Sequence, residues 1–357
     1  MSIKVVFANK YLSEVIWEEN LTNTEFEKHT KRLLAVVDSN AEWFFKQSIL
    51  SNVKIPYFVF DEPSEIKKNQ ETVDKIHDFL FEKAADRKSI LLAIGGGITL
   101  DTVGFAASVY KRGIDWIAVP TTLLAQVDAS VGGKTAINHP VYGKNVIGTF
   151  HPPIKVFIDS SCSLTWNDEL RLEGIAEMYK IFKTFDHSSL NKLIKKPNDS
   201  LTKRSIELKA KVVDIDPYEM NLRAILNYGH TFAHALESLV NNDQDHRKLP
   251  HGIAVSAGMR LENCVASILG IMTDDELEKA EKELDKLGFP HIKLPEFESL
   301  INFMLQDKKA ESGKINLCLI DGKKEVNFEP VDPRTHANIN LLRDGYEKYL
   351  KEFQNAR

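Results

Sequence analysis

Short apolar runs alternate with longer stretches of helical periodicity in the first part of the chain. The apolar runs are LLAVVDSN, IPYFVF, SILLAIGGG and DWIAVPTT, and they are rich in β-branched residues. Between them, ETVDKIHDFLFEKAADR and TLDTVGFAASVYKRG repeat apolar residues at the spacing of a helix. Strands that alternate with helices are typical of a parallel sheet covered by helices. We therefore expect an α/β domain over residues 1–160.

From about Ser163 the pattern changes to amphipathic helices with few strand signals. Segments of this kind are DELRLEGIAEMYKIFKTF, SLTKRSIELKAKVVDI, GIAVSAGMRLENCVASIL and TDDELEKAEKELDKLG. Helical spacing of their apolar residues predicts that these helices pack together. We expect a mostly α-helical domain over residues 161–357, joined to the first domain near Pro152 and Pro153.

The balance of charges excludes some classes of binding protein. The 357 residues include 46 Lys and Arg against 51 Asp and Glu, a net charge of −5. Such a chain has no general attraction for nucleic acid or acidic membranes, so any cationic site must be local. Cys162, Cys264 and Cys318 lack metal-motif spacing, and no apolar run reaches the roughly 18 residues of a membrane span. Because the N-terminus also lacks the pattern of a signal peptide, we expect a cytoplasmic protein.

A turn of three glycines, 95–97, follows the apolar strand predicted over residues 89–94. Glycine permits positive φ and lets backbone N–H groups approach a diphosphate at the start of the following helix. Asp38 ends an earlier apolar run, where its carboxylate could bind ribose hydroxyls, and Asp101 lies just past the glycines. The motif is not GxGxxG, so an ordinary turn with Asp residues as helix caps is the alternative. Together these features favour a Rossmann-like nucleotide-binding domain.

One glutamate and three histidines have the residue types of a catalytic metal site. His230 and His234 are four residues apart, so on a helix they share one face; His251 follows them. Glu177 has Lys180 one helical turn later. A set of one Glu and two His leaves positions open for substrate oxygens, as catalytic zinc requires. Any one of the histidines, taken singly, is more often a structural residue.

Lys134 stands out among the cationic residues. It follows two glycines inside VDASVGGKTAIN, a largely uncharged stretch where burial of an unneeded ammonium would be costly. We therefore expect an anion site for a phosphate or carboxylate, with lysines as point charges and arginine as a bidentate partner. Other cationic residues that recur in motifs, and that equally fit solvated helix faces, are Lys144, Lys180, Lys209, Arg223, Lys308 and Lys309.

The motifs together resemble one family closely, 3-dehydroquinate synthase within the sugar phosphate cyclases. The resemblance runs from about Val36 to Lys309 and rests on GGGITLDTVGFAASVYKRG, VPTTLLAQVDASVGGKTAINHP, GKNVIGTF, EGIAEMYK, LRAILNYGHTFAHALE and PHGIAVSAGM. It implies conversion of 3-deoxy-D-arabino-heptulosonate 7-phosphate into 3-dehydroquinate and phosphate, the second step of the shikimate route. NAD would be reduced and reoxidised in each turnover, phosphate would leave between the two hydride transfers, and an aldol addition would close the ring.

The resemblance also implies roles for individual residues. Glu177, His230 and His251 would hold the metal, zinc or cobalt, and His234 would be the acid/base residue beside it. The substrate's hydroxyls, carboxylate and phosphate would be bound by Asp128, Lys134, Asn145, Lys180, Lys209, Arg223, Asn227 and Lys308, the last favoured over Lys309. NAD would be bound by Asp38, Asn40, Glu65, Lys68, Gly95, Gly96, Gly97, Asp101, Thr121, Thr122, Thr165 and, at the boundary with the substrate, Lys144. Arg112 would reach the phosphate site of a neighbouring subunit, which implies a homodimer.

Four positions depart from the commonest pattern of the family. NHPVYGKN carries one residue more before Lys144, and Tyr179 adds bulk close to the Glu177 position. Trp166 replaces a leucine, and the usual glycine before Glu65 is missing. None of these changes removes a side chain to which the resemblance gives a catalytic role.

Three alternatives remain at this level. The first is a cyclase that makes a valiolone-type or deoxy-inosose product from a sugar phosphate without a carboxylate; retention of Lys209, Arg223 and Asn227 argues against it. The second is a metal-dependent alcohol dehydrogenase of similar architecture, which would release an oxidised product and consume NAD. The third is a catalytically silent binding protein, which no missing ligand suggests.

Overall fold

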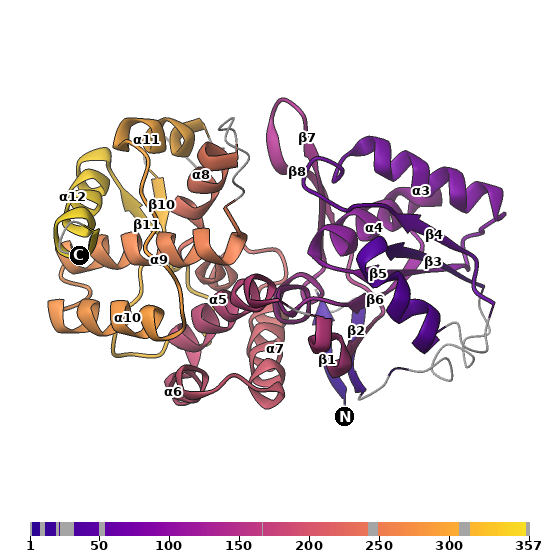
Figure 1. Cartoon of the computed structure of the whole chain (residues 1–357), viewed down its shortest axis with the longest axis horizontal. Coiled ribbons are helices and arrows are strands. Elements are labelled where there is room, and N and C mark those ends of the chain that lie inside the picture. Colours follow the sequence, from indigo (N-terminus) through magenta and orange to yellow (C-terminus); the bar gives the residue numbers. More distant parts are fainter. Residues whose placement is uncertain are drawn as a thin grey trace. The chain divides into compact units, whose positions relative to one another are not determined.

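A computed structural model describes residues 2–7, 11–18, 21, 32–49, 54–165, 167–241, 249–306 and 315–354. The chain divides into one unit of Met1–Gly174 with Lys209–Tyr218 and a second unit of Ile175–Leu208 with Glu219–Arg357. The segment Lys209–Tyr218 thus packs with the first unit although it lies later in the sequence. The expected α/β part and the expected helical part are both present (Figure 1).

A seven-stranded sheet forms the core of the first unit. Its order is β1-β2-β9-β6-β5-β3-β4, with β1 antiparallel to β2 and the other neighbours parallel. The strands are Ser2–Phe7 (β1), Tyr11–Glu18 (β2), Leu33–Asp38 (β3), Tyr57–Phe60 (β4), Ile90–Gly95 (β5), Asp115–Pro120 (β6) and Lys155–Asp159 (β9). Chain order reverses between β3 and β5, because β4 lies on one side of β3 and the later strands lie on the other. Sheets of this kind bind ligands beyond the carboxyl ends of the strands at that reversal.

Strands β3 and β5 are buried on both faces. Val36 lies opposite Ala93 and Val37 opposite Ile94 in the parallel register, and all of β5 is buried. A strand covered on both faces is apolar throughout, which explains why neither run alternates with polar residues. The buried register fixes the backbone at the points where β3 ends at Asp38 and β5 ends at Gly95.

Helices and a hairpin complete the first unit. Helices α3 (Gln70–Glu82) and α4 (Gly97–Val109) pack against each other, and α4 also packs against β7. Strands β7 (Lys134–His139) and β8 (Gly143–Phe150) pair as a separate antiparallel hairpin. The shorter helical segments are η1 (Ser39–Ala41), α2 (Glu42–Phe44), η2 (Phe45–Ile49), η3 (Tyr110–Arg112), η4 (Ala125–Ala129) and η5 (Ser160–Thr165).

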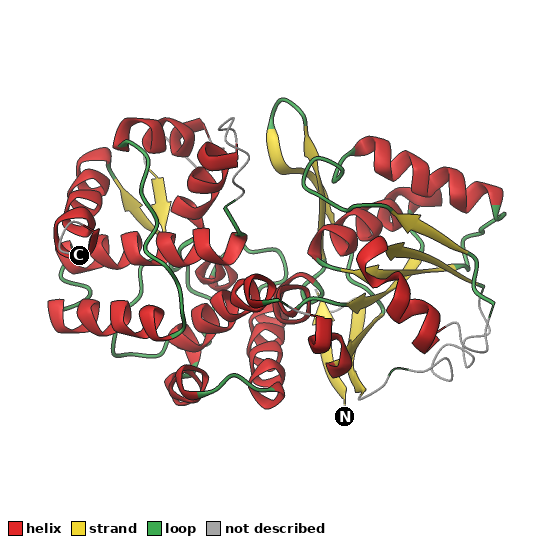
Figure 2. Cartoon of the chain, in the orientation of Figure 1, coloured by secondary structure: helices red, strands yellow, loops and turns green. Residues whose placement is uncertain are grey.

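Helices make up most of the second unit, as Figure 2 shows. They are α5 (Asp168–Phe185), α6 (His187–Lys195), α7 (Asp199–Ile215), η6 (Leu222–Asn227), α8 (His230–Asn241), α9 (His251–Ile268), α10 (Asp274–Lys286), α11 (Phe297–Gln306), α12 (Ile339–Tyr349) and η7 (Leu350–Gln354), of which α5 begins and α7 ends among residues of the first unit. Two short strands, β10 (Ile315–Leu317) and β11 (Thr335–Ala337), pair antiparallel. Within the described part of the chain, no helix is long and apolar enough to cross a membrane.

Helix α9 is the centre of the second unit's core. Its residues are buried almost continuously from Gly252 to Ala266, and it contacts α8, α10 and α12. Arg260 is fully buried in it; the guanidinium pairs with Glu281 and donates to Asp285 Oδ1 at 3.0 Å. These carboxylates neutralise a charge that would otherwise be very costly to bury. α9 is therefore a rigid support for the helices beside it.

Candidate functional site

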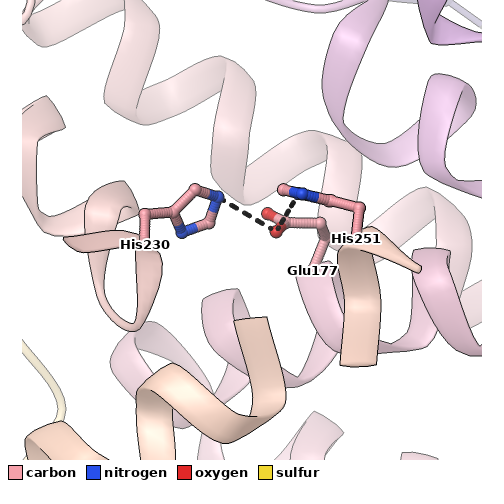
Figure 3. Close-up of side chains that lie close together, drawn as sticks. All are labelled: Glu177, His230 and His251. Atoms are coloured by element: carbon pink, nitrogen blue, oxygen red, sulfur yellow. Dashed lines mark ion pairs between the residues drawn. The ribbon is translucent and has the colours of Figure 1, made fainter. Parts of the chain in front are cut away.

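Three side chains from three helices meet in the second unit. Glu177 lies in the middle of α5, whereas His230 and His251 are the first residues of α8 and α9. One ligand atom from each lies within 4.8 Å of the others. Figure 3 shows the carboxylate of Glu177 between the two imidazoles. This set combines the residue types of a catalytic metal site.

The two oxygens of Glu177 have different surroundings. Oε2 pairs with the Lys180 ammonium one helical turn later. Oε1 is buried and, among the described residues, has no hydrogen-bond partner; it lies 3.5 Å from His230 Nε2 and 3.7 Å from His251 Nε2. An orphaned buried oxygen of this kind is costly unless something satisfies it. Atoms that bind one zinc ion about 2 Å away are roughly 3.3 Å apart in tetrahedral geometry, so these distances fit a shared metal.

Burial and neighbouring charges shift the pKa values of the three groups. Burial alone would raise the pKa of Glu177, but Lys180 and His251 outweigh it and hold that pKa at about 2. Burial lowers the pKa of His230 well below its ordinary value, and the charge of Lys180 adds to this. For His251, the neighbouring carboxylates of Glu177 and Glu237 overcome burial and raise the pKa to about 10. In the metal-free chain His230 is therefore neutral, and a metal must displace a proton from His251 to bind there.

A contact between two glycines brings the start of α8 against the middle of α9. A Cβ on Gly258 of α9 would lie 1.9 Å from the carbonyl oxygen of Gly229, which itself has φ of +82°. Buried Glu262 accepts from the N–H of Gly229 at 3.0 Å, and Tyr228 donates to Asn263 at 2.6 Å. Small residues allow the backbones to touch, and the hydrogen bonds fix the residue before His230.

His234 lies apart from the set of three, although it shares helix α8 with His230. Their rings are 5.7 Å apart and nearly perpendicular. Helical spacing alone makes the two histidines equivalent, yet only His230 lies within reach of both Glu177 and His251 among the described residues. The arrangement matches the division of roles that the resemblance implies; the acid/base role of His234 stays a prediction.

The expected dinucleotide residues meet at the reversal point of the first unit's sheet. Asp38 ends β3 and is 6% exposed; one carboxylate oxygen accepts from Asn40 N–H at 2.8 Å and the other from Thr99 at 3.3 Å. A Cβ on Gly95 would lie 2.7 Å from the Cβ of Asp38. Gly96 caps α4 without a side chain. Backbone N–H groups at the start of α4 could therefore bind an anion. The Asp38 carboxylate beside them could accept further hydrogen bonds.

Burial raises the pKa of both aspartates at this end of the sheet. For Asp38, burial outweighs the hydrogen bonds from Asn40 and Gly96. For Asp101, burial outweighs the nearby ammonium of Lys68, whose Nζ lies 2.5 Å from Asp101 Oδ2. Hydrogen-bond donors such as ribose hydroxyls would stabilise the charged form of either carboxylate.

Asn138, which was not among the expected residues, links several that were. Its side-chain amide donates to Glu65 Oε2 at 2.8 Å, and its Oδ1 accepts from the N–H of Asn145 at 2.9 Å. Lys68 Nζ donates to Asn145 Oδ1 at 2.5 Å. Asn145 itself has φ of +56°, a left-handed conformation that this network holds. The motif NHP before the loop was the available signal, but the contacts are tertiary and no spacing predicts them.

The expected anion-binding residues differ in their surroundings. Lys209 is buried and pairs with Asp128 in the same unit. Arg223 is 2% exposed, and Asn227 donates to Glu219 Oε1 at 2.7 Å. Lys134 is exposed at the start of β7, so the cost of burying its ammonium, which its uncharged surroundings suggested, does not arise.

The structure shows the surroundings of two of the positions that depart from the family pattern. The additional residue before Lys144 lies in the turn of the β7–β8 hairpin, where Val141 and Tyr142 are exposed. Tyr179 is fully buried and donates to Glu283 Oε2 at 3.2 Å. It stands two residues from Glu177 on the same helix and therefore faces away from it.

Some expected residues are not described in full. Lys308 and Lys309 lie outside the described residues, as does Trp166, and nothing is described of the Thr165 side chain. Of the other expected dinucleotide residues, Thr121 and Thr122 follow β6, and the Thr121 N–H donates to Gly95. Lys144 is exposed on β8.

Comparison with known proteins gives matches along most of the chain. Residues 59–171 match the 3-dehydroquinate synthase N-terminal family, and residues 174–310 match the corresponding C-terminal family. A 3-dehydroquinate synthase of Helicobacter pylori (strain P12) is 42% identical over 266 residues, covering 73% of this chain and 76% of the relative. That of Campylobacter curvus (strain 525.92) is 38% identical over 316 residues, covering 86% and 87%.

Solved structures of other enzymes share the fold. A 2-deoxy-scyllo-inosose synthase complexed with carbaglucose-6-phosphate, NAD⁺ and Co²⁺ has a TM-score of 0.83 at 22% identity, covering 98% of this chain and 99% of that one. A 2-epi-5-epi-valiolone synthase from Streptomyces hygroscopicus subsp. jinggangensis 5008, with NAD⁺ and Zn²⁺ bound, has 0.81 at 22% identity, covering 94% and 96%. A probable glycerol dehydrogenase from Sinorhizobium meliloti 1021 has 0.64 at 14% identity, covering 96% and 97%. At such identities the likeness concerns the fold alone.

Proposed function

Because the chain belongs to the 3-dehydroquinate synthase family, we propose that it converts 3-deoxy-D-arabino-heptulosonate 7-phosphate into 3-dehydroquinate and phosphate, with NAD and a divalent metal as cofactors. The observation that carries the proposal is the set of Glu177, His230 and His251, in which one buried carboxylate oxygen has no hydrogen-bond partner within the described part of the chain. A phosphate-eliminating cyclase needs both a redox cofactor and a Lewis acid, and the chain offers residues suited to each.

The metal would be held by Glu177 Oε1 and by the Nε2 atoms of the two histidines. Three protein ligands leave coordination positions for substrate oxygens. A divalent cation supplies Lewis acidity there, which polarises hydroxyl and carbonyl oxygens of the substrate. Zinc and cobalt both suit two imidazoles and a carboxylate, and two cyclase structures of this fold contain Co²⁺ and Zn²⁺ respectively.

His234 would take the proton from the substrate hydroxyl that is oxidised and return it when the ketone is reduced. Imidazole suits this task because it ordinarily titrates near neutral pH. On α8, His234 lies one turn beyond His230, so a hydroxyl oriented by the metal ligands would be close to its ring. Lys180, paired with Glu177, would add a positive charge beside the substrate's oxygens.

NAD would lie at the carboxyl ends of β3 and β5. Asp38 would accept hydrogen bonds from a ribose, and N–H groups at the start of α4 would bind the diphosphate. NAD supplies a hydride acceptor that is restored within each turnover. Lys68, Asp101, Asn145 and Glu65 are joined directly or through Asn138, so they would present their polar groups as one set.

The cationic residues would hold the two acidic groups of the substrate. Arg223 offers a planar fork for a carboxylate or phosphate, and Lys209 is fixed by Asp128. Lys134 is exposed and would act as a point charge. Anchoring both ends of the seven-carbon chain would fix the carbon atoms that must later join, which is the main advantage of binding before an intramolecular reaction.

We further propose a homodimer in which Arg112 serves the neighbouring subunit. Arg112 is exposed, and three successive residues, Lys111, Arg112 and Gly113, have positive φ of 49°, 70° and 107°. Backbone strain of this kind in non-glycine residues is concentrated at functional segments.

We also propose a cytoplasmic location. It agrees with the three buried cysteine thiols, which need no oxidising compartment.

A comparison of substrates tests the proposed reaction. Phosphate release is measured with zinc-loaded protein and catalytic NAD on the heptulosonate phosphate, sedoheptulose 7-phosphate and glucose 6-phosphate. We expect release from the first, because the carboxylate has cationic partners. Preference for either of the other two sugar phosphates would assign the chain to another cyclase activity of the same fold.

A further inference from the structure

A second carboxylate stands behind one of the two histidines. Glu237 lies on α8, seven residues after His230 and three after His234, so the three side chains share one face of the helix. Glu237 is 5% exposed, and its Oε1 lies 2.8 Å from Nδ1 of His251. Helix α8 therefore positions both histidines of the set formed by Glu177, His230 and His251. His230 is part of α8, and Glu237 of α8 holds His251 through the hydrogen bond.

The contact defines which nitrogen of His251 faces Glu177. A neutral imidazole has one N–H and one lone pair, and a carboxylate at one nitrogen keeps the proton there. With Nδ1–H donated to Glu237, the proton that a metal would displace from His251, and the lone pair that this leaves, are at Nε2, which lies 3.7 Å from Glu177 Oε1. The ring is thereby both turned toward Glu177 and held in the tautomer that a metal requires.

The two histidines differ in the strength of this support. His230 Nδ1 faces the backbone carbonyl of Tyr228 at 3.3 Å, a longer contact to a neutral acceptor. His251 is also the more exposed of the two, with 28% of its side chain accessible against 12% for His230. The more exposed ring, which packing constrains less, is the one with the charged and shorter hydrogen bond.

We propose that Glu237 is a positioning residue of the metal site: it fixes the tautomer and orientation of His251 and so sets the affinity for the metal. This inference rests on the proposed metal site, and it concerns a residue that need not touch substrate. Carboxylates behind metal-binding histidines typically account for about 10- to 100-fold in metal affinity or activity.

The test is the zinc dissociation constant, measured by chelator competition on purified folded protein. We expect Glu237→Gln, which keeps the shape but removes the charge, to weaken zinc binding about 10-fold, and Glu237→Ala to weaken it toward 100-fold. The visible spectrum of the cobalt-loaded protein should also change in both variants, because the His251 ligand is less well oriented. A merely structural role for Glu237 would leave that spectrum as in the parent.

Glu281→Gln is the matched control, since Glu281 is an equally buried glutamate of the same unit that pairs with Arg260 away from the set of three. It should lower the melting temperature of the metal-free protein while zinc affinity stays at the parent value. If Glu237→Ala does not fold, the isosteric Glu237→Gln decides the outcome. Parent-like zinc affinity and cobalt spectrum in Glu237→Gln overturn the role of Glu237, whereas absence of zinc binding in the parent overturns the metal site itself.

Discussion

Single atoms decide the chemistry of the set formed by Glu177, His230 and His251. Lys180 pairs with one oxygen of Glu177, and the other oxygen is buried between two Nε2 atoms, with no hydrogen-bond partner among the described residues. Leaving such an atom unpaired is costly, so its surroundings suit a bound cation. His234 is not part of this group in the described part of the chain, so the role proposed for it is separable from metal binding.

That separation gives a prediction for three variants. Glu177→Ala and His251→Ala should lose bound metal, because each removes one of three ligands. His234→Ala should keep its metal while turnover falls by about 10²- to 10⁴-fold, the usual contribution of a general acid/base. Metal content by elemental mass spectrometry and phosphate release are measured on the same samples. Loss of metal from His234→Ala would make His234 a ligand and contradict the assignment.

The ends of elements, more than their faces, carry the polar groups of both candidate sites. His230 and His251 begin helices, Asp38 ends a strand, and Gly96 precedes the first turn of α4. At the end of a helix or strand, the packed core fixes the backbone of the residue. Its side chain or N–H group extends past the end of the element, where a ligand can reach it. Glu177, in the middle of α5, is one exception. Asn145 is another, since the side chain of Asn138 holds it in the β7–β8 hairpin.

Asn138→Ala should therefore weaken the dinucleotide site through the hairpin. It removes the hydrogen bonds to Glu65 and Asn145, and one such bond is worth about 0.5–1.5 kcal/mol. We expect the dissociation constant for NAD, from calorimetric titration, to rise about 3- to 10-fold. Asn69→Ala is the control, because it removes an asparagine side chain that caps α3. It should lower the stability of the fold more than the affinity for NAD. Equal effects of the two variants on NAD binding would refute the role of Asn138.

The start of α10 predicts how one element responds to acid. Thr273 and Glu276 form a capping box, and Lys323 pairs with Glu276 at 3.0 Å. The backbone N–H of Thr273 is the main cause that lowers the Glu276 pKa to about 2, with Lys323 adding to it. Because the folded-state pKa is depressed, the stabilisation is complete above the unfolded value of roughly 4.3 and is lost as pH falls toward 2.

Glu276→Ala should accordingly destabilise the protein by about 1 kcal/mol near neutral pH, and the difference from the parent should shrink below about pH 4. Thermal unfolding followed by circular dichroism at pH 7, 5 and 3 measures this. Glu278→Ala is the control, since Glu278 is exposed on the same helix and pairs with exposed Lys282. A difference that stays constant with pH would show that the carboxylate charge is not what stabilises the cap.

At the scale of the whole molecule, hydrophobic patterning was sufficient to predict the α/β part, the helical part and the glycine turn. The run ending at Asp38 and the run before Gly95 were predicted as strands because buried parallel strands are apolar throughout. Their juxtaposition at the sheet's reversal point was not predictable from pattern, since it depends on strand order.

Site residues were predictable to the extent that local spacing or family motifs mark them. His230 and His234 have equivalent spacing, and only the tertiary contact of α8 with α9 distinguishes them. Glu237 had a signal, its position two turns after His230, but its partner His251 belongs to another helix, α9. The exposure of Lys134 depends on the placement of a hairpin, which local composition does not report.

In the proposed reaction, the protein eliminates phosphate from the substrate while NAD is reduced and reoxidised in each turnover. The most direct measurement is phosphate released per NAD supplied, using zinc-loaded protein, the heptulosonate phosphate and substoichiometric NAD, with NADH absorbance followed in parallel. We expect many phosphates per NAD and no accumulation of NADH. One NADH for each substrate molecule consumed, without phosphate, would show a dehydrogenase and contradict the proposed reaction.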